Sequence, residues 1–144
     1  MEDIHYYTTT VAWKNGRIGE LTEPGFPAIE VATPPEFPGG VPNIWSPEHL
    51  YVASAVVCLM TTFLAIAENS KLSFSAFACK GKGKLEKIDR TFLISEIELI
   101  PEISVPDEHS KERALKIIEK SERACLISNS MKSEIILKPE IRVL

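Results

Sequence analysis

The longest mostly apolar segment of the chain runs from Leu50 to Ala67 and carries no charged side chain. Ser46 precedes it, and its hydroxyl can accept a hydrogen bond from a free N–H of a first helical turn. Pro47 suits the first helical position because no N–H is needed there. A helix that is apolar all round is normally enclosed by other protein. The pattern therefore predicts a long buried helix that begins at Ser46 and ends at Asn69.

The length of this segment also raises the alternative of a membrane span. Its 18 residues would extend only about 27 Å as a helix, slightly less than a hydrocarbon core of roughly 30 Å. No Lys or Arg flanks it closely, although such residues usually border a spanning helix. We therefore favour a core helix and expect no membrane association.

Three strands are predicted before the helix. Residues 4–13 are rich in aromatic and β-branched types, which favour strands. The Asn-Gly dipeptide at 15–16 is typical of a type I′ hairpin turn, and it would place Arg17 at the first position of the returning strand. A third short strand is expected at 29–33. The loop at 34–43 follows, because its four prolines and two glycines disfavour regular structure.

Two strands are predicted after the helix, at residues 72–79 and 91–99. The stretch between them contains glycines and lysines, and we expect it to be a link. Lys80, Lys82 and Lys84 alternate along the chain, which indicates a solvated face.

A second helix is expected after a break that Pro101 and Pro106 bracket. Asp107 or Ser110 can cap it, and it would end near Arg123 or Cys125. Its apolar residues recur on one side, as in a helix that lies on a core. The apolar residues are Ala114, Leu115, Ile117, Ile118, Leu126 and Ile127.

The last element is a strand from Glu134 to Val143, broken by Pro139. The order βββ-α-ββ-α-β indicates the α+β class. A chain of 144 residues with 44% hydrophobic content is expected to form one domain, residues 1–144.

The composition of the chain argues against some classes of function and some cellular locations. The formal net charge of −4 argues against a nucleic-acid surface. The N-terminus lacks a basic region followed by an apolar segment, so we expect no secretory signal and a cytoplasmic location.

The chain has three cysteines, an odd number without a Cys-x-x-Cys motif. This pattern favours neither a zinc site nor a secreted disulfide framework. In a reducing compartment, such cysteines are core residues or carry redox chemistry. Cys79 ends a predicted strand with no partner, so we expect it to be structural.

A Cys-His hydrolase is disfavoured by spacing. His49 lies nine residues before Cys58, which is roughly 900° of rotation on one helix and places the two on opposite faces. His109 and Cys125 are turned away from each other in the same manner. His5 could reach a cysteine only through tertiary contact.

The remaining chemistry uses two thiols. A thiolate attacks a peroxide oxygen, and a second cysteine captures the resulting sulfenic acid. An apolar helix should raise the pKa of Cys58, so the thiolate needs a positive partner.

Two motifs resemble those of the OsmC/Ohr family, which comprises osmotically inducible protein C and the organic hydroperoxide resistance proteins. Ser-Pro-Glu-His-Leu at 46–50, followed by Ala-Ser-Ala-Val-Val-Cys-Leu-Met-Thr at 53–61, resembles the central-helix signature. Ala-Cys-Leu-Ile-Ser-Asn-Ser-Met-Lys at 124–132 resembles the second-cysteine motif. The Asn-Gly-Arg hairpin lies where the family carries an arginine. The sequence departs from the family at Leu126, where many members have proline, and at Cys79.

The resemblance implies an OsmC-like fold, an intertwined homodimer and a peroxidase that reduces organic hydroperoxides or hydrogen peroxide. Cys58 would be the peroxidatic thiol, Cys125 the resolving thiol, Arg17 the charge partner and Glu48 the carboxylate that orients Arg17. Arg17 suits its implied role because a guanidinium offers a planar fork of donors. A predicted helix C-terminus would disfavour the thiolate of Cys125, as suits a resolving thiol. An external dithiol would be the reductant, without bound cofactor or metal. A non-catalytic dimer that binds a small ligand on the same fold, with an apolar channel beside Cys58 as its pocket, remains the alternative.

Spacing adds one expectation about assembly. Glu48 and Cys58 are ten residues apart, or roughly 15 Å along one helix, which a Glu side chain cannot span. Either Arg17 bridges the gap, or a second chain contributes to the site. We therefore predict an obligate homodimer with two sites at the subunit interface.

Overall fold

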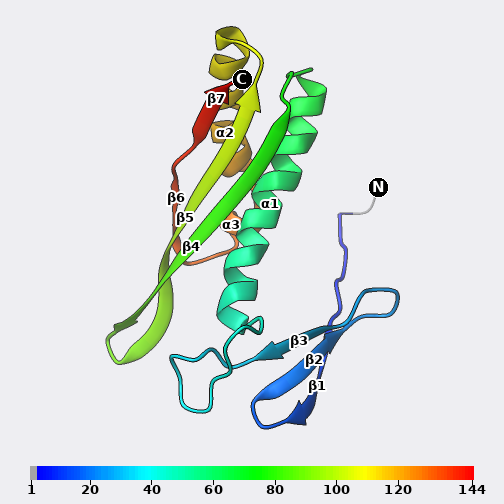
Figure 1. Ribbon diagram of the computed structural model, residues 1–144, viewed down its shortest axis with the longest axis vertical. Coiled ribbons are helices and arrows are strands. Elements are labelled where there is room, and N and C mark those ends of the chain that lie inside the picture. Colours follow the sequence, from blue (N-terminus) through cyan, green and yellow to red (C-terminus); the bar gives the residue numbers. More distant parts are fainter. Residues whose placement is uncertain (1–2) are drawn as a thin grey trace. The chain divides into compact units, whose positions relative to one another are not determined.

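The computed structural model describes residues 3–144 (Figure 1). Contacts within the chain divide it into two compact units, one ending at Leu50 and the other running from Tyr51 to Leu144. Helix α1 (Pro47–Asn69) begins in the first unit and belongs mainly to the second. The expectation that residues 1–144 form one domain stays a prediction.

The first unit contains a three-stranded antiparallel sheet in the order β1-β2-β3. Strand β1 spans Thr10–Asn15, β2 spans Ile18–Thr22 and β3 spans Ile29–Ala32. The predicted first strand is therefore wrong over residues 4–9, which precede β1 outside any strand. Their aromatic and β-branched content is a weak signal, because strand propensity depends on a partner that these residues lack in the sheet.

The hairpin between β1 and β2 turns one residue later than the Asn-Gly pattern predicted. Asn15 pairs with Ile18, so Gly16 and Arg17 form the two-residue turn. Gly16 has a φ of 53°, which glycine adopts without a steric penalty. A shift in register after Trp13 displaces the pairing, and Arg17 consequently lies in the turn rather than in the returning strand.

Helix α1 begins as its sequence predicted. The Ser46 hydroxyl accepts a hydrogen bond from the N–H of His49 at 3.1 Å, and the Ser46 carbonyl accepts one from the N–H of Leu50 at 2.9 Å. These two bonds satisfy groups that a helix start otherwise leaves free. The predicted cap and the end of the helix at Asn69 are confirmed.

The second unit is built on a four-stranded sheet. Strands β4 (Ala76–Ile88) and β5 (Thr91–Val105) form a long antiparallel hairpin that turns at Asp89 and Arg90, both with positive φ. Strands β6 (Glu134–Leu137) and β7 (Glu140–Val143) both pair in parallel with β5. Pro139 interrupts the final strand, as predicted.

The predicted Gly- and Lys-rich link is wrong, since β4 continues through it. Gly81 and Gly83 lie opposite α1, where an added Cβ on Gly81 would sit 2.4 Å from Val56 and one on Gly83 would sit 2.6 Å from Val52. These glycines therefore allow close packing of helix on strand rather than marking a loop. The neighbouring lysines alternate with them and are exposed, which confirms the solvated face.

The break predicted at Pro101 is also wrong, because Pro101 lies inside β5 and is buried. The carbonyls of Leu99 and Val105 both accept hydrogen bonds from the β6–β7 side of the sheet. Residues two apart on a strand point their backbone groups the same way, so the Pro101 nitrogen faces this side as well. On that side the neighbouring strand is interrupted at Pro139, between β6 and β7. The missing N–H of Pro101 therefore costs no hydrogen bond between strands.

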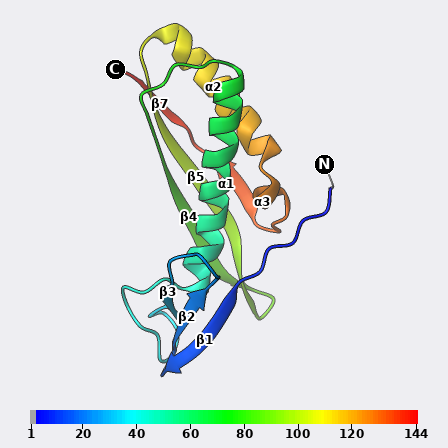
Figure 2. The same ribbon diagram turned by 90° about the vertical axis from the view of Figure 1, so that its right-hand side faces the viewer.

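Helix α2 spans Glu108–Ala124, and the short helix α3 spans Leu126–Asn129. The Asp107 side chain caps α2 by accepting a hydrogen bond from the N–H of Ser110 at 2.7 Å. Helices α1 and α2 cover the same face of the sheet (Figure 2). The buried core between them consists of Ala55, Leu59, Phe63, Ala67, Leu72, Ile97, Leu99, Ile103, Val105, Ala114, Ile117 and Ile118.

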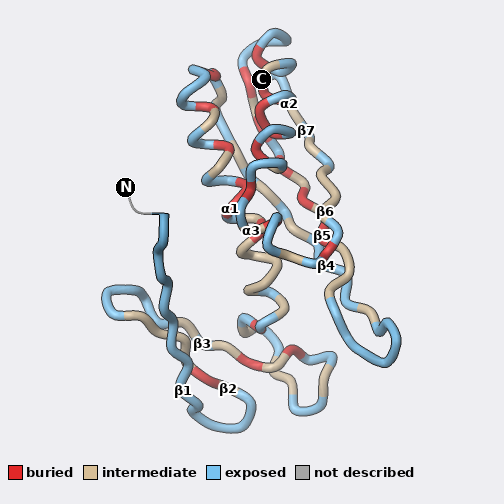
Figure 3. Tube along the Cα trace, turned by 180° about the vertical axis from the view of Figure 1, so that it is seen from behind, coloured by how far each residue is buried: buried red, intermediate tan, exposed pale blue. Residues whose placement is uncertain are grey.

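Helix α1 is buried on the side that faces the sheet and exposed on the other (Figure 3). Exposed residues follow one stripe of the helix: Val57, Met60, Thr61, Leu64, Ala65 and Glu68. Among the described residues, α1 is the one helix long and apolar enough to cross a membrane. Its inner side, however, supplies core residues of the second unit, as expected of a core helix.

Candidate active site

Cys58 lies in the middle of α1, on the side that faces the core, and 9% of its surface is exposed. Thr62 follows one turn later on the same helix, and its hydroxyl lies 3.9 Å from the Cys58 sulfur. This proximity follows from the helical repeat, since residues four apart share a face. The apolar run of α1 thus carries a thiol with a polar neighbour.

Cys125 lies at the junction of α2 and α3 and is fully buried. It ends α2 as its C-cap residue and also precedes the first residue of α3, so the predicted position at a helix C-terminus is confirmed. Ser128 on α3 donates a hydrogen bond to the Cys125 sulfur over 3.4 Å. The helix α3 was not predicted, because four residues are too short for a periodic pattern.

The two cysteines are free thiols, and each perturbs the pKa of the other. Burial raises the pKa of Cys58, but hydrogen bonds from the Cys125 thiol, the Ile127 N–H, the Thr62 hydroxyl and the Leu126 N–H together hold that pKa below its ordinary value. Two of these donors are backbone N–H groups at the start of α3, which have no partner within the helix. The thiolate of Cys58 is therefore stabilised by neutral donors.

The pKa of Cys125 moves in the opposite direction. Burial raises it first, and the hydrogen bond to Cys58 raises it further, whereas Ser128 opposes both. The pair combines one thiol with a lowered pKa and a neighbour with a raised pKa, as suits the nucleophile and the second thiol of a two-cysteine reaction.

Cys79 lies apart from this chemistry on β4, where it pairs with Pro101. Burial raises its pKa to about 11, so its thiol stays protonated at neutral pH. A protonated thiol is a poor nucleophile, which supports the structural role expected for Cys79.

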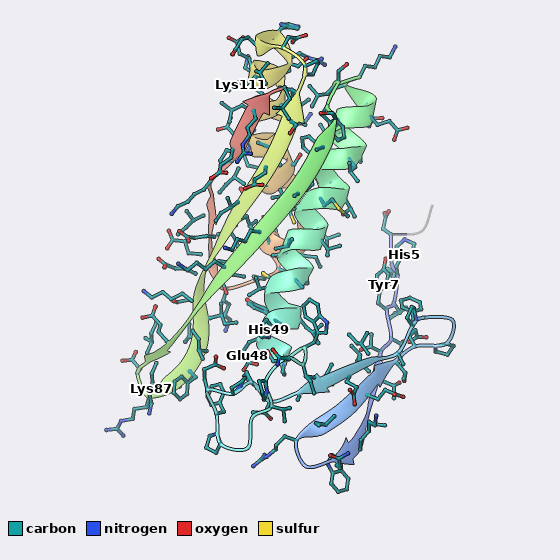
Figure 4. All side chains as sticks on the ribbon, in the orientation of Figure 1. His5, Tyr7, Glu48, His49, Lys87 and Lys111 are labelled. Carbon is teal, nitrogen blue, oxygen red and sulfur yellow. The ribbon has the colours of Figure 1, made fainter. Side chains whose placement is uncertain are left out.

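Arg17 and Glu48 both belong to the first unit. Arg17 is exposed in the β1–β2 turn, and its side chain passes over Gly39, where an added Cβ would sit 2.9 Å from Nε. Glu48 lies in the first turn of α1 (Figure 4). Within residues 3–144, no ion pair joins these two side chains. Their roles toward Cys58 stay predictions.

Glu48 has one distinctive feature. Its Oε1 atom is shielded from solvent and has no hydrogen-bond partner in the described part of the chain. A buried carboxylate oxygen without a donor is unfavourable.

His49 is engaged at the start of α1. Its Nδ1 lies 2.7 Å from the Ser46 hydroxyl, and its ring meets Trp45 edge to face with centroids 6.1 Å apart. These contacts give the imidazole a structural role, in keeping with the rejection of a Cys-His hydrolase.

Sequence reasoning missed the hydroxyl groups around the sulfurs. Thr62 is four residues after Cys58 and Ser128 is three after Cys125, which are the spacings that bring side chains together on a helix. These signals were therefore present, whereas the N–H groups of α3 become visible only in the fold.

Tyr51 anchors the chain that leaves α3. Its hydroxyl lies 2.8 Å from the hydroxyl of Ser133, which in turn donates to the carbonyl of Ile94 on β5. The segment after Cys125 is thus tied both to α1 and to the sheet.

A metal site receives no support from the side chains. Within residues 3–144, His, Cys, Asp and Glu form no group of three or more that could hold a metal ion.

These features define an α+β protein with a buried pair of thiols, one on the long helix α1 and one at the junction of α2 and α3. The sequence profile of OsmC-like proteins matches residues 40–140, and the chain belongs to this family. A search of curated protein sequences found no match.

Solved structures agree with the family fold. An OsmC-like protein of unknown function from Vibrio cholerae superposes with a TM-score of 0.84 at 20% identity, covering 94% of this chain and 99% of its own. An organic hydroperoxide resistance protein from Elizabethkingia anophelis gives 0.75 at 23%, covering 97% and 99%. OhrB, the organic hydroperoxide resistance protein of Bacillus subtilis, gives 0.68 at 19%, covering 94% and 98%. The predicted family and the α+β OsmC-like fold are confirmed.

Proposed function

We propose that this protein is a cysteine-based peroxidase that reduces organic hydroperoxides, or hydrogen peroxide, by a two-cysteine mechanism. The observation that carries the proposal is the contact between Cys58 and Cys125 with opposite pKa shifts. Family membership supports it, because several structural neighbours are named organic hydroperoxide resistance proteins.

The chemistry begins with the Cys58 thiolate, which attacks one peroxide oxygen. An S–O bond forms and the O–O bond breaks, so the sulfur is oxidised to a sulfenic acid and the alkoxide takes up a proton and leaves as an alcohol. The Cys125 sulfur then attacks the Cys58 sulfur. An S–S bond forms, the S–O bond breaks, and the hydroxyl leaves with the proton of Cys125 as water.

An external dithiol would return the disulfide to two thiols by thiol–disulfide exchange. The proposal requires no bound cofactor or metal, because the two thiols and the dithiol supply all electrons. We place the reaction in the cytoplasm, where such reductants keep thiols reduced.

The proposed assembly is a homodimer that shares its sites. The exposed apolar stripe of α1, which includes Val57, Met60 and Leu64, would be covered by the second copy. The unpartnered Oε1 of Glu48 would receive a donor at this interface. The guanidinium of Arg17, with its planar fork of donors, would stabilise charge at Cys58 of the other chain and on the leaving alkoxide.

Free-thiol titration tests this function directly. The protein is reduced, freed of reductant and mixed with one equivalent of cumene hydroperoxide. The proposal predicts rapid loss of two thiols per chain, with Cys79→Ser protein as a control that loses the same two. No loss of thiols would contradict the peroxidase and favour the alternative.

The alternative is a dimer that binds a small ligand without catalysis. A cavity of about 630 Å³ in the first unit favours it, since apolar side chains of β1, β2 and β3 line most of its wall. Two results together would support this function. A saturated alcohol, which is the reduced form of an organic hydroperoxide, would bind at equilibrium, and addition of peroxide would cause no loss of thiols.

A further inference from the structure

Ser128 is a polar side chain within the second-cysteine motif, and the mechanism above gives it no role. It is buried with 5% of its surface exposed, and its hydroxyl donates to the Cys125 sulfur over 3.4 Å. Helix α3 produces this contact, because Cys125 directly precedes α3 and Ser128 is its third residue. The geometry therefore gives the second thiol a donor of its own.

The surroundings of Cys125 change during the proposed reaction. Before oxidation, burial raises the pKa of Cys125, and Cys58 raises it further by hydrogen bonding and by its charge. Once Cys58 has become an uncharged sulfenic acid, the charge that opposed ionisation of Cys125 is gone. The Ser128 hydroxyl then remains as a donor aimed at the sulfur that must become a thiolate.

We propose that Ser128 stabilises the developing thiolate of Cys125 and so accelerates disulfide formation with the sulfenic acid of Cys58. This inference rests on the proposed function and deepens it. Ser128 donates a hydrogen bond while the Cys125 proton passes to the departing hydroxyl, the S–S bond forms, the S–O bond breaks and water leaves. Ser128 itself is neither oxidised nor reduced, and it acts in the second step alone.

The selectivity for the second step follows from the contacts. The donors that lower the pKa of Cys58 are Cys125, Ile127, Thr62 and Leu126, and Ser128 is not among them. Loss of the Ser128 hydroxyl should therefore leave the attack on peroxide unchanged. The first and second steps can be measured separately, because a dimedone-type probe traps the sulfenic acid that lies between them.

The test uses the full chain and cumene hydroperoxide. Samples are quenched with the probe at increasing times, and the sulfenic acid at Cys58 is quantified by mass spectrometry. We expect Ser128→Ala to form sulfenic acid at the wild-type rate and to lose it about tenfold more slowly, since a hydrogen bond to an ionised group is worth at least that factor. The pH profile of this loss should move to higher pH, and Ser128→Thr should restore both.

The matched control is Ser121→Ala, which also removes a buried hydroxyl. That hydroxyl donates to the Ile117 carbonyl within α2, and its loss should leave the decay of the sulfenic acid unchanged. Equal decay in Ser128→Ala and wild type, or a slower decay without a shift in pH profile, would overturn the role of Ser128. The proposed function fails separately if Cys125→Ser protein accumulates no sulfenic acid at Cys58.

Discussion

A single methyl group added at Gly81 should push α1 away from β4. The Cβ of Gly81→Ala would lie 2.4 Å from a methyl carbon of Val56 and 2.9 Å from one of Val52. Both neighbours are β-branched residues in a helix, where one side-chain rotamer is strongly preferred. They cannot swing aside at low cost, so the helix has to move.

The expected cost combines two opposing effects. Overpacking of this kind costs about 1–3 kcal/mol, whereas replacing glycine stabilises by about 0.4–1 kcal/mol through the entropy of the unfolded chain. The cost of overpacking is the larger effect, so we expect a net loss of about 1–2 kcal/mol in the free energy of unfolding. Because α1 carries Cys58, its movement should weaken the hydrogen bonds from α3 and raise the pKa of that thiol.

Urea unfolding measures the first effect, and the rate of iodoacetamide alkylation of Cys58 against pH measures the second. The control is a double-mutant cycle with Val56→Ala, which removes the methyl group that Gly81→Ala would strike. We expect a favourable coupling of about 1 kcal/mol between the two changes. Unaltered stability in Gly81→Ala, together with zero coupling, would refute the close packing of α1 on β4.

Three further changes test the core, the helix cap and the charge partner. Phe63→Ala should cost about 3–5 kcal/mol in urea unfolding because the ring is fully buried; a loss under about 1 kcal/mol would contradict its place in the core. The N–H of Ser110 lowers the pKa of Asp107, so this carboxylate stabilises the fold above its unfolded pKa of about 3.9, and the stabilisation is lost as the pH falls through the folded value. The urea midpoints of wild type and Asp107→Asn should therefore differ by a constant amount above about pH 4, and this difference should change below that pH. A difference that stays constant down to acid pH would refute a contribution of the Asp107 charge to the helix cap. Arg17→Lys keeps a cation but loses the planar fork, so the alkylation profile of Cys58 should move to higher pH, and an unchanged profile in Arg17→Ala would exclude a role in activation.

The elements that could be predicted from sequence are those with a local cause. The helix from Ser46 to Asn69 follows from a capping residue, a proline at the first position and an uncharged run, all read within one segment. The break at Pro139 is equally local. By contrast, Gly81 and Pro101 are ordinary loop signals. Their place inside strands is explained only by distant elements, namely helix α1 packed against Gly81 and the interruption at Pro139 beside Pro101.

The same distinction applies to the site. The resemblance of two short motifs singled out Cys58 and Cys125, and the fold brings them together. The chemical environment of Cys58 was predicted in part: burial does raise its pKa, but neutral donors on α3 offset that effect. No periodic pattern reports a four-residue helix, so these donors could not be read from the chain.

A complementation experiment tests whether each site of the proposed dimer is built from residues of both chains. Co-refolded Arg17→Ala and Cys58→Ser chains should recover about one intact site per heterodimer if the two residues come from different chains. A stable and fully active monomer in sedimentation, or inactive heterodimers of verified composition, would contradict this arrangement.

The central claim is that peroxide oxidises Cys58 first and that Cys125 then closes a disulfide with it. Peptide mapping after one equivalent of cumene hydroperoxide tests this order most directly, with a dimedone-type probe present in parallel samples. The account predicts a Cys58–Cys125 disulfide in the wild type, and in Cys125→Ser a trapped sulfenic acid at Cys58 after a single turnover. Trapping mainly at Cys79 or Cys125, or peroxide consumption that survives in Cys58→Ser, would contradict it.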